Sequence, residues 1–379
     1  MQDPVKLLKE LIALPSVNPA FLPPHDPRAG ERNVADFITS LAAAAGLDID
    51  TQPVLPNRAN LFFRLLPSGR VRRRILLAPH MDTVGVASDE QFQPVRKGTR
   101  LYGRGACDTK GSIAVMLSAL LQLAQRGKRP QETELVFVAL VDEEWGQSGS
   151  RALARSRSRC QADLAIVGEP TRLKVVTAHK GDLWLQLETR GLAAHGSRPE
   201  LGRNAVHLMA RVVDLLETGY ARQLRRKRHP LLRHATINVG SIAGGLQPNI
   251  VPDRCTIKID RRTVPGERDT LVKAEILKFL RRHGLKARMV DTKVEEPAPP
   301  LETDAKLPLV SQFLRCARQA RPAGVDFFTD AGVLAAAGIP CVVFGPGDIA
   351  QAHTVDEWVA ISQVEGGAAL LRRFLADLP

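Results

Sequence analysis

Hydrophobic residues in this 379-residue chain fall into short unbroken runs that alternate with longer amphipathic stretches. Runs of roughly four to eight apolar residues are typical of strands covered by helices on both faces, and apolar residues three and four apart are typical of helices. The expected strands are 49–54, 61–66, 74–78, 134–141, 164–167 and 341–344, and the expected helices are 5–13, 31–45, 112–125, 307–319, 331–337 and 363–376. This order predicts an α/β fold: a mainly parallel twisted sheet with helices on both faces.

The pattern changes at about residue 180. Leu183, Leu185 and Leu187 alternate with polar residues, which predicts a half-exposed strand. A helix (204–217), two strands (235–239 and 254–260), a helix (269–282) and a last strand (286–290) follow. The order β-α-β-β-α-β is that of a small α+β sandwich with one open sheet face. We therefore expect a discontinuous domain, residues 1–179 and 295–379, with an α+β domain inserted at 180–294.

Acidic residues and histidines come directly after the expected strands of the larger domain. The stretch Leu101–Gly111 places Asp108 behind two glycines at the start of a helix, and glycines permit the sharp turn this requires. The carboxyl ends of parallel strands meet at one edge of a sheet, where α/β proteins bind ligands. The residues expected to converge there are His80, Asp82, Asp108, Glu143, Glu144, Glu169 and His353.

Histidine nitrogens and carboxylate oxygens are zinc ligands, and two-metal sites need a carboxylate that bridges both ions. His80, Asp108, Glu144, Glu169 and His353 form such a set. Asp82 could accept the other ring N–H of the neighbouring histidine, and Glu143 could face the water as a general base. Each also has an ordinary interpretation, as a structural histidine, a solvated acidic pair or a simple glycine turn. The residues alone leave a two-metal hydrolase and this structural interpretation open.

The residues do exclude some other sites. Gly103-Arg-Gly105-Ala-Cys-Asp108 is not a dinucleotide fingerprint, because Asp108 occupies the third glycine position and no βαβ unit opens there. The net charge of +13 comes from arginine clusters without interleaved aromatic residues, so we expect a solvated surface rather than a nucleic-acid site. No apolar run is long enough to span a membrane, and the amphipathic N-terminus does not resemble a signal peptide. Five scattered cysteines indicate a reducing cytoplasm.

Five sequence blocks, read in order, resemble the metallopeptidase family that includes acetylornithine deacetylase, succinyl-diaminopimelate desuccinylase, aminoacylase and glutamate carboxypeptidase. The blocks are His80-Met-Asp-Thr-Val, Gly103–Gly111, Asp142-Glu-Glu-Trp-Gly, Gly168-Glu-Pro-Thr and Gly345-Pro-Gly with Ala352-His353. Residues 345–357 are most similar to the acetylornithine deacetylase branch. The desuccinylase branch would have a Ser/Gly-rich stretch where this chain has Phe327-Phe-Thr-Asp-Ala331.

The resemblance implies two Zn²⁺ per chain, with Co²⁺ or Mn²⁺ as possible substitutes. One ion would be held by His80 and Glu169 and the other by Glu144 and His353, with Asp108 bridging. Asp82 would support the first histidine and Glu143 would be the catalytic base. The peptide bond after the bridging aspartate is cis in the family, so Asp108–Thr109 is expected to be cis.

The resemblance also implies roles for the inserted domain, which in the family is a lid that forms a homodimer. His195 would reach the partner subunit's active site and steady the oxyanion, and Asn249 and Arg262 would hold the substrate carboxylate. Gly196 replaces a serine common in the family, which puts the local acyl contacts in question. The implied reaction is hydrolysis of the amide of a small N-acyl amino acid, of the N-acetyl-ornithine type. Desuccinylase and carboxypeptidase or dipeptidase activities remain alternatives, and a non-enzymatic binding protein is disfavoured.

Overall fold

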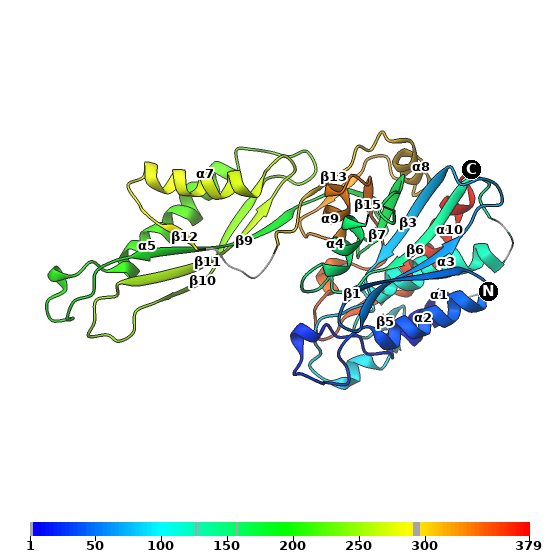
Figure 1. Cartoon of the computed structure of the whole chain (residues 1–379), viewed down its shortest axis with the longest axis horizontal. Helices are drawn as coiled ribbons and strands as arrows, with labels where there is room; N and C mark the ends of the chain where they lie inside the picture. Colours follow the sequence, from blue (N-terminus) through cyan, green and yellow to red (C-terminus); the bar gives the residue numbers. More distant parts are fainter. Residues whose placement is uncertain (1–2, 126, 128, 157, 291–295) are drawn as a thin grey trace. The chain divides into compact units, whose positions relative to one another are not determined.

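The computed structural model describes residues 3–125, 127, 129–156, 158–290 and 296–379 (Figure 1). The chain forms two compact units. The larger unit comprises Met1–Thr177, Glu302–Ala323 and Thr329–Pro379, and the smaller comprises Ala178–Leu301 and Gly324–Phe328. No helix among the described residues is both long and apolar enough to cross a membrane.

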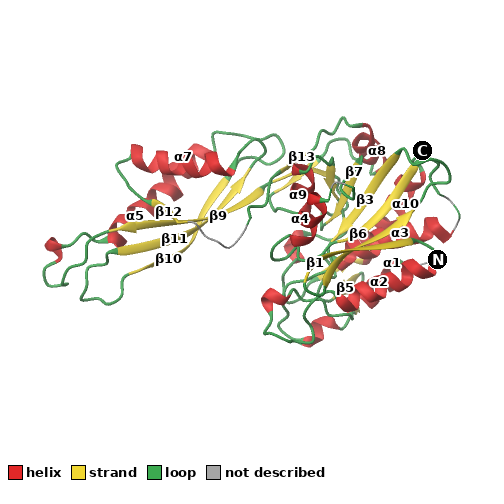
Figure 2. Cartoon of the chain, in the orientation of Figure 1, coloured by secondary structure: helices red, strands yellow, loops and turns green. Residues whose placement is uncertain are grey.

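A large mixed sheet forms the centre of the larger unit (Figure 2). Its strand order is β1-β2-β6-β3-β7-β15-β8-β13, with β14 beside β8. The strands are β1 (Asp48–Leu55), β2 (Arg58–Leu65), β3 (Arg73–Pro79), β6 (Thr133–Ala139), β7 (Leu164–Gly168), β8 (Val176–His179), β13 (Leu301–Glu302), β14 (Ala323–Val325) and β15 (Cys341–Val343). β3 pairs in parallel with β6 and with β7, and β7 pairs in parallel with β15. The predicted parallel sheet is confirmed at its centre, with antiparallel pairs on either side.

Helices cover both faces of this sheet, as predicted. One face carries α1 (Pro4–Ile12), α2 (Arg32–Ala44), α3 (Lys110–Gln125), α8 (Pro308–Cys316) and α10 (Ile361–Ala376). The other carries α4 (Ser148–Arg155) and α9 (Asp330–Ala336). Helix α3 is buried along almost its whole length because it packs between the sheet and α10. Each of its fully buried leucines contributes on the order of 2 kcal/mol of hydrophobic stabilisation, which fixes the helix that begins directly after Asp108.

The smaller unit is a four-stranded antiparallel sheet with helices on one face. Its strands are β9 (Gly181–Arg190), β10 (Thr236–Gly244), β11 (Arg254–Thr263) and β12 (Arg288–Val290), and its main helices are α5 (Ala205–Asp214) and α7 (Asp269–Arg282). The sheet order β10-β11-β9-β12 and the chain order β-α-β-β-α-β confirm the predicted sandwich. Leu183, Leu185 and Leu187 face its core, whereas Trp184 is 54% exposed.

Two local features differ from the sequence prediction. The helix expected at 204–217 stops at Asp214, and a π-helical turn (Leu215–Tyr220) leads into the short helix α6 (Ala221–Leu224). A separate three-stranded sheet, β4 (Val95–Lys97), β5 (Arg100–Tyr102) and β16 (Trp358–Ala360), was not predicted. Strands of three residues are too short to show a hydrophobic period. Their pairing nevertheless brings residue 357 beside the turn that carries Asp108.

Candidate metal centre

The acidic residues and histidines singled out in the larger unit lie together at the carboxyl ends of its central strands. His80 follows β3, Glu143 and Glu144 follow β6, and Glu169 follows β7. Since these strands are neighbours and parallel, their ends present the side chains at one edge of the sheet. Asp108 begins the turn into α3, and the last ligand candidate, His353, comes from the loop after β15. The sheet topology thus brings side chains from five separate motifs together in one cluster.

Asp108 lies between the two histidines. Its Oδ1 is 3.2 Å from Nε2 of His80, and its Oδ2 is 3.4 Å from Nε2 of His353. The same ring nitrogen of His353 is 3.1 Å from Oε2 of Glu144. The Asp108–Thr109 peptide bond is cis, as expected. One carboxylate therefore offers one oxygen to each of two histidines, which is the arrangement a bridging ligand needs.

Two groups of side chains bring their candidate ligand atoms within 4.8 Å of one another. One group is His80, Glu143 and Glu169, and the other is Asp108, Glu144 and His353. The first group contains Glu143, the residue expected to be a base, beside the expected ligands. The structure thus places the expected base close to the expected ligand atoms of its neighbours.

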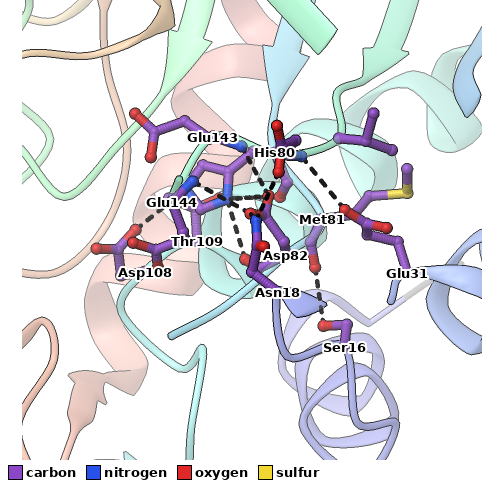
Figure 3. Close-up of polar contacts among 12 residues, drawn as sticks. Ser16, Asn18, Glu31, His80, Met81, Asp82, Asp108, Thr109, Glu143 and Glu144 are labelled. Carbon is purple, nitrogen blue, oxygen red and sulfur yellow. Dashed lines mark hydrogen bonds and ion pairs between the residues drawn. The ribbon is translucent and has the colours of Figure 1, made fainter. Parts of the chain in front are cut away.

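Asp82 holds this edge of the sheet together (Figure 3). Its Oδ1 accepts the backbone N–H of Glu143 and its Oδ2 that of Glu144, both at 3.1 Å. The ring Nδ1 of His80 lies 3.0 Å from the backbone carbonyl of Asp82 and 3.4 Å from its Oδ1. The main-chain carbonyl of Asp82 is thus a closer acceptor for the ring N–H than the expected carboxylate. The carboxylate instead fixes the turn that carries both glutamates.

Sequence reasoning missed a buried polar network beneath this turn. Asn18 donates from one amide nitrogen to Asp82 Oδ2 at 2.7 Å and to Asp142 Oδ1 at 2.9 Å, and its own oxygen accepts the N–H of Ala20 at 3.1 Å. Arg58 pairs with Glu31 at 2.6 Å and with Asp142 at 3.0 Å. Asn18, Glu31 and Arg58 lie far from the motifs in sequence and show no periodic or motif signal. Only the fold reveals that they support the glutamate turn.

The carboxylates of this cluster repel one another in a buried setting. Burial, and then the charge of Asp108, raises the pKa of Glu144 to about 7 and that of Glu169 well above its ordinary value. Burial and the charge of Glu169 likewise raise the pKa of Glu143. Hydrogen bonds to Asp108 and Glu144 raise the pKa of His353 to about 10. The cluster therefore has an excess of negative charge that its two histidines balance only in part.

This chemistry fits divalent cations. Oε1 of Glu169 is buried and has no hydrogen-bond partner among the described residues, and its nearest cationic candidate, His80 Nε2, is 3.7 Å away. A buried carboxylate oxygen without a partner is costly unless a ligand satisfies it. The cluster offers nitrogen and oxygen donors from two groups of three side chains. Such a donor set, with Asp108 between the two histidines, suits a pair of ions such as Zn²⁺.

His195 and Asn249, singled out in the smaller unit, lie on two strand-like segments that pair with each other. The N–H of Gly196 donates to the carbonyl of Asn249 at 2.7 Å, and a β-bridge joins His195 to Ile250. A Cβ atom on Gly196 would lie 2.9 Å from backbone atoms of Asn249, closer than real Cβ contacts allow. The glycine that replaces the family's serine is therefore what permits this close pairing.

Arg262 lies at the opposite end of β11 from the loop that carries Asn249. Its guanidinium contacts Asp260 at 2.9 Å and lies over the ring of Phe328. The loop joins the Arg254 end of this ten-residue strand. At about 3.3 Å per residue, the strand separates the two residues by roughly 25 Å. The structure brings His195 and Asn249 together, and it does not bring Arg262 to them within one chain.

The fold and the cluster at its strand ends define a class of protein. Residues 76–377 match the model of peptidase family M20/M25/M40, and the chain belongs to that family. Together with the hydrolases it resembles, this makes the protein a hydrolase.

Individual relatives point in the same direction. The chain is 33% identical over 352 residues to acetylornithine deacetylase of Myxococcus xanthus, which covers 90% of each chain. Among solved structures, an aminopeptidase of Bacillus cereus superposes with a TM-score of 0.78 at 22% identity, covering 98% of this chain and 97% of that one. A protein of Bacillus subtilis described as a dinuclear metal binding peptidase of the M20 family gives a TM-score of 0.70 at 12% identity, covering 98% and 96%. The structural matches establish the fold.

Proposed function

We propose that this enzyme hydrolyses the amide bond of an N-acyl amino acid, with an N-acetyl-ornithine-type compound as substrate and acetate and the free amino acid as products. The observation that supports this most is Asp108, whose two oxygens each face one histidine of a five-ligand cluster. The relative at 33% identity is named an acetylornithine deacetylase, which supports the choice of acyl group and amino acid.

In this proposal His80 and Glu169 would hold one Zn²⁺, Glu144 and His353 would hold the other, and Asp108 would be shared by both. Co²⁺ or Mn²⁺ could replace zinc, because mixed histidine and carboxylate sites accept several divalent ions. Two such ions would acidify a water between them and polarise the carbonyl of the scissile amide. The protein's task is then to orient the substrate and to move one proton.

Glu143 is the proposed base. Its carboxylate lies beside the side chains of His80 and Glu169, within reach of a water held at that group. It would remove the proton from the attacking water and deliver it to the leaving amine nitrogen. Asp82 holds the backbone of this residue and fixes its position relative to His80. Separate backbone bonds to Glu143 and Glu144 let one glutamate serve as base while the other serves as ligand.

His195 is the proposed donor to the oxygen that becomes negative during the attack. The backbone N–H of Ser197 points at its Nδ1 from 3.2 Å, so Nδ1 is the acceptor and the proton of the neutral ring lies on Nε2. This tautomer leaves an N–H free to donate to an oxyanion. Asn249 and Arg262 are assigned to the substrate carboxylate, as the family resemblance implies.

We infer that two chains form a homodimer through the smaller unit. The roughly 25 Å along β11 between Arg262 and the loop of Asn249 is too long for both to hold one carboxylate within a single chain. Residues from two subunits could do so. Within the part of the chain that the structure describes, β10 is an edge strand that pairs on one side only, and Leu246, two residues beyond its end, is 91% exposed. The five free cysteines, which form no disulfide, support a cytoplasmic setting.

A substrate screen on the metal-loaded enzyme tests the proposal. N-acetyl-ornithine, N-succinyl-diaminopimelate, other N-acyl amino acids and dipeptides are compared by kcat/KM. N-acetyl-ornithine should be the best substrate. A preference for the succinyl compound or for dipeptides would instead establish a desuccinylase or a peptidase at the same site. Salt-dependent binding to nucleic acid without any hydrolysis would overturn the enzymatic assignment.

The Glu143→Gln variant tests the base. It should bind two metal ions and lose about 10²- to 10⁴-fold in kcat, because the amide cannot take up the proton. Metal analysis of the same preparation serves as its control. A metal-replete variant with near-normal kcat would contradict the role of this residue.

A further inference from the structure

Glu357 is a buried carboxylate next to the metal centre that has no place in the mechanism above. Its side chain is 1% exposed. Its Oε1 accepts the backbone N–H groups of Cys107 at 2.8 Å and Asp108 at 3.0 Å. Its Oε2 accepts the N–H of Gly105 at 3.0 Å and the Nη1 of Arg104 at 2.6 Å. All four donors belong to the single turn that presents Asp108.

This turn needs an anion at its centre. Gly103 and Gly105 have φ values of +148° and +80°, which allow the backbone to curl until three N–H groups point inward. Such a concave set of N–H groups binds negative charge. Arg104 adds a guanidinium that is almost fully buried, and a buried cation requires a partner. Among the described residues, Glu357 supplies a carboxylate that contacts both the three N–H groups and Arg104.

The position of Glu357 follows from the small sheet that sequence analysis missed. Trp358 pairs with Tyr102 in the β5–β16 ladder, and the carbonyl of Glu357 accepts the N–H of Gly103 at 3.0 Å. Glu357 also lies four residues after His353 along the chain. It therefore ties the segment of one metal-ligand candidate to the turn of another.

We propose that Glu357, paired with Arg104, is the positioning residue for the bridging carboxylate, and that it sets the affinity for both metal ions without contacting either. The inference rests on the two-metal centre of the proposed function. Asp108 is the ligand that the two ions would share, so a shift of its backbone lowers the binding affinity for both ions. A substitution at His353 lowers the binding affinity for one ion only.

Glutamine cannot replace this glutamate. Each oxygen of Glu357 accepts two donors, and an amide presents an NH₂ group where one of those oxygens stood. The two N–H donors that bound that oxygen then face the NH₂ group, which is itself a donor. Arg104 also loses the negative charge that paired with it. Residues that orient metal ligands typically change metal affinity about 10- to 100-fold when they are altered. We expect a loss of that size for each ion in Glu357→Gln.

Glu134→Gln is a matched control. Glu134 is also a buried carboxylate paired with an arginine, Arg74, at 2.6 Å. It lies at the start of β6, whereas Glu143 and Glu144 follow the other end of that strand. The substitution removes a buried carboxylate paired with an arginine at the same distance, here a half-buried arginine, in the large sheet whose strands carry the candidate ligands. It should leave metal binding unchanged.

The experiment is a Co²⁺ titration of metal-free full-length protein, followed by visible absorption, with circular dichroism to confirm folding. Glu357→Gln should weaken both binding steps about 10- to 100-fold and alter the cobalt spectrum. His353→Ala should weaken one binding step. Glu134→Gln should bind both ions as the wild type does. Wild-type affinity for both ions in Glu357→Gln, or an equal loss in Glu134→Gln, would overturn the proposal. If Glu357→Gln does not fold, Arg104→Lys takes its place: a loss in both steps supports the proposal, and wild-type titration overturns it. Metal binding is read without substrate, so a wild type that binds two ions and hydrolyses nothing would refute the proposed reaction alone.

Discussion

The Asp82→Asn substitution probes how strongly the metal centre depends on the hydrogen bonds around it. The carboxylate of Asp82 accepts three hydrogen bonds: Oδ1 accepts the N–H of Glu143, and Oδ2 accepts Nδ2 of Asn18 and the N–H of Glu144. Asparagine keeps one oxygen and turns the other into a donor. With the NH₂ group at the Oδ1 position the N–H of Glu143 loses its acceptor, and with the NH₂ group at the Oδ2 position both Asn18 and the N–H of Glu144 do.

The size of the effect follows from these contacts. A hydrogen bond to a charged group contributes about 1.5–3 kcal/mol, so the loss of one or two amounts to roughly 1.5–6 kcal/mol, shared between stability and metal binding. The part expressed in metal affinity should be about 10- to 100-fold, or about 1.4–2.8 kcal/mol. The ring tautomer of His80 should survive, because the main-chain carbonyl of Asp82 still accepts its N–H at 3.0 Å. The variant should therefore bind two ions at high metal concentration.

Calorimetric metal titration and urea unfolding of the metal-free protein measure the two parts separately. Asp163→Asn is the control, because its carboxylate also accepts a backbone N–H, from Arg74 at 2.8 Å, but at the amino-terminal end of the strands. It should change neither quantity by much. Unaltered metal affinity together with an unaltered unfolding midpoint in Asp82→Asn would refute the reasoning, since a buried donor cannot lose its acceptor without cost.

Two further predictions concern the bridge and the acid stability. Asp108→Ala should lose both ions and Glu169→Ala one, as measured by metal content after gel filtration; two ions retained in Asp108→Ala would contradict the bridge. Burial lowers the pKa of His179 to about 4. Between pH 6.5 and 4 the unfolded chain therefore binds a proton that the folded chain does not, and acidification destabilises the fold by on the order of 3 kcal/mol. His179→Leu should remove that part of the pH dependence in urea unfolding at pH 7 and pH 4.5, and an identical dependence in both proteins would contradict it.

The sequence determined the fold class and most of the cluster. Unbroken apolar runs such as 134–141 identify buried strands because both faces of a parallel sheet are covered, and residues that follow such runs must lie at the same edge. The sequence alone therefore predicts that His80, Glu144 and Glu169 lie near one another. The helix expected at 5–13 is α1, which begins at Pro4, where Oδ1 of Asp3 accepts the N–H of Val5 at 2.8 Å.

Boundaries were less well determined by sequence. Residues Gly324–Phe328, assigned to the larger domain from their position in the chain, belong to the smaller unit. Three-residue strands such as β5 and β16 have no period of their own, and their pairing depends on two segments about 250 residues apart. Contacts of that range leave no local pattern to read.

Only the tertiary structure decided which residues hold the cluster in place. Asn18 and Arg58 have ordinary neighbours in the sequence, and Glu357 ends the stretch 345–357 without being a candidate ligand. Each acquires its role from donors or acceptors that the fold delivers from elsewhere. Ligand types can be recognised in a sequence because few side chains bind metal. Supporting hydrogen bonds use side chains that occur everywhere, and their significance lies in burial and geometry, which exist only once the chain has folded.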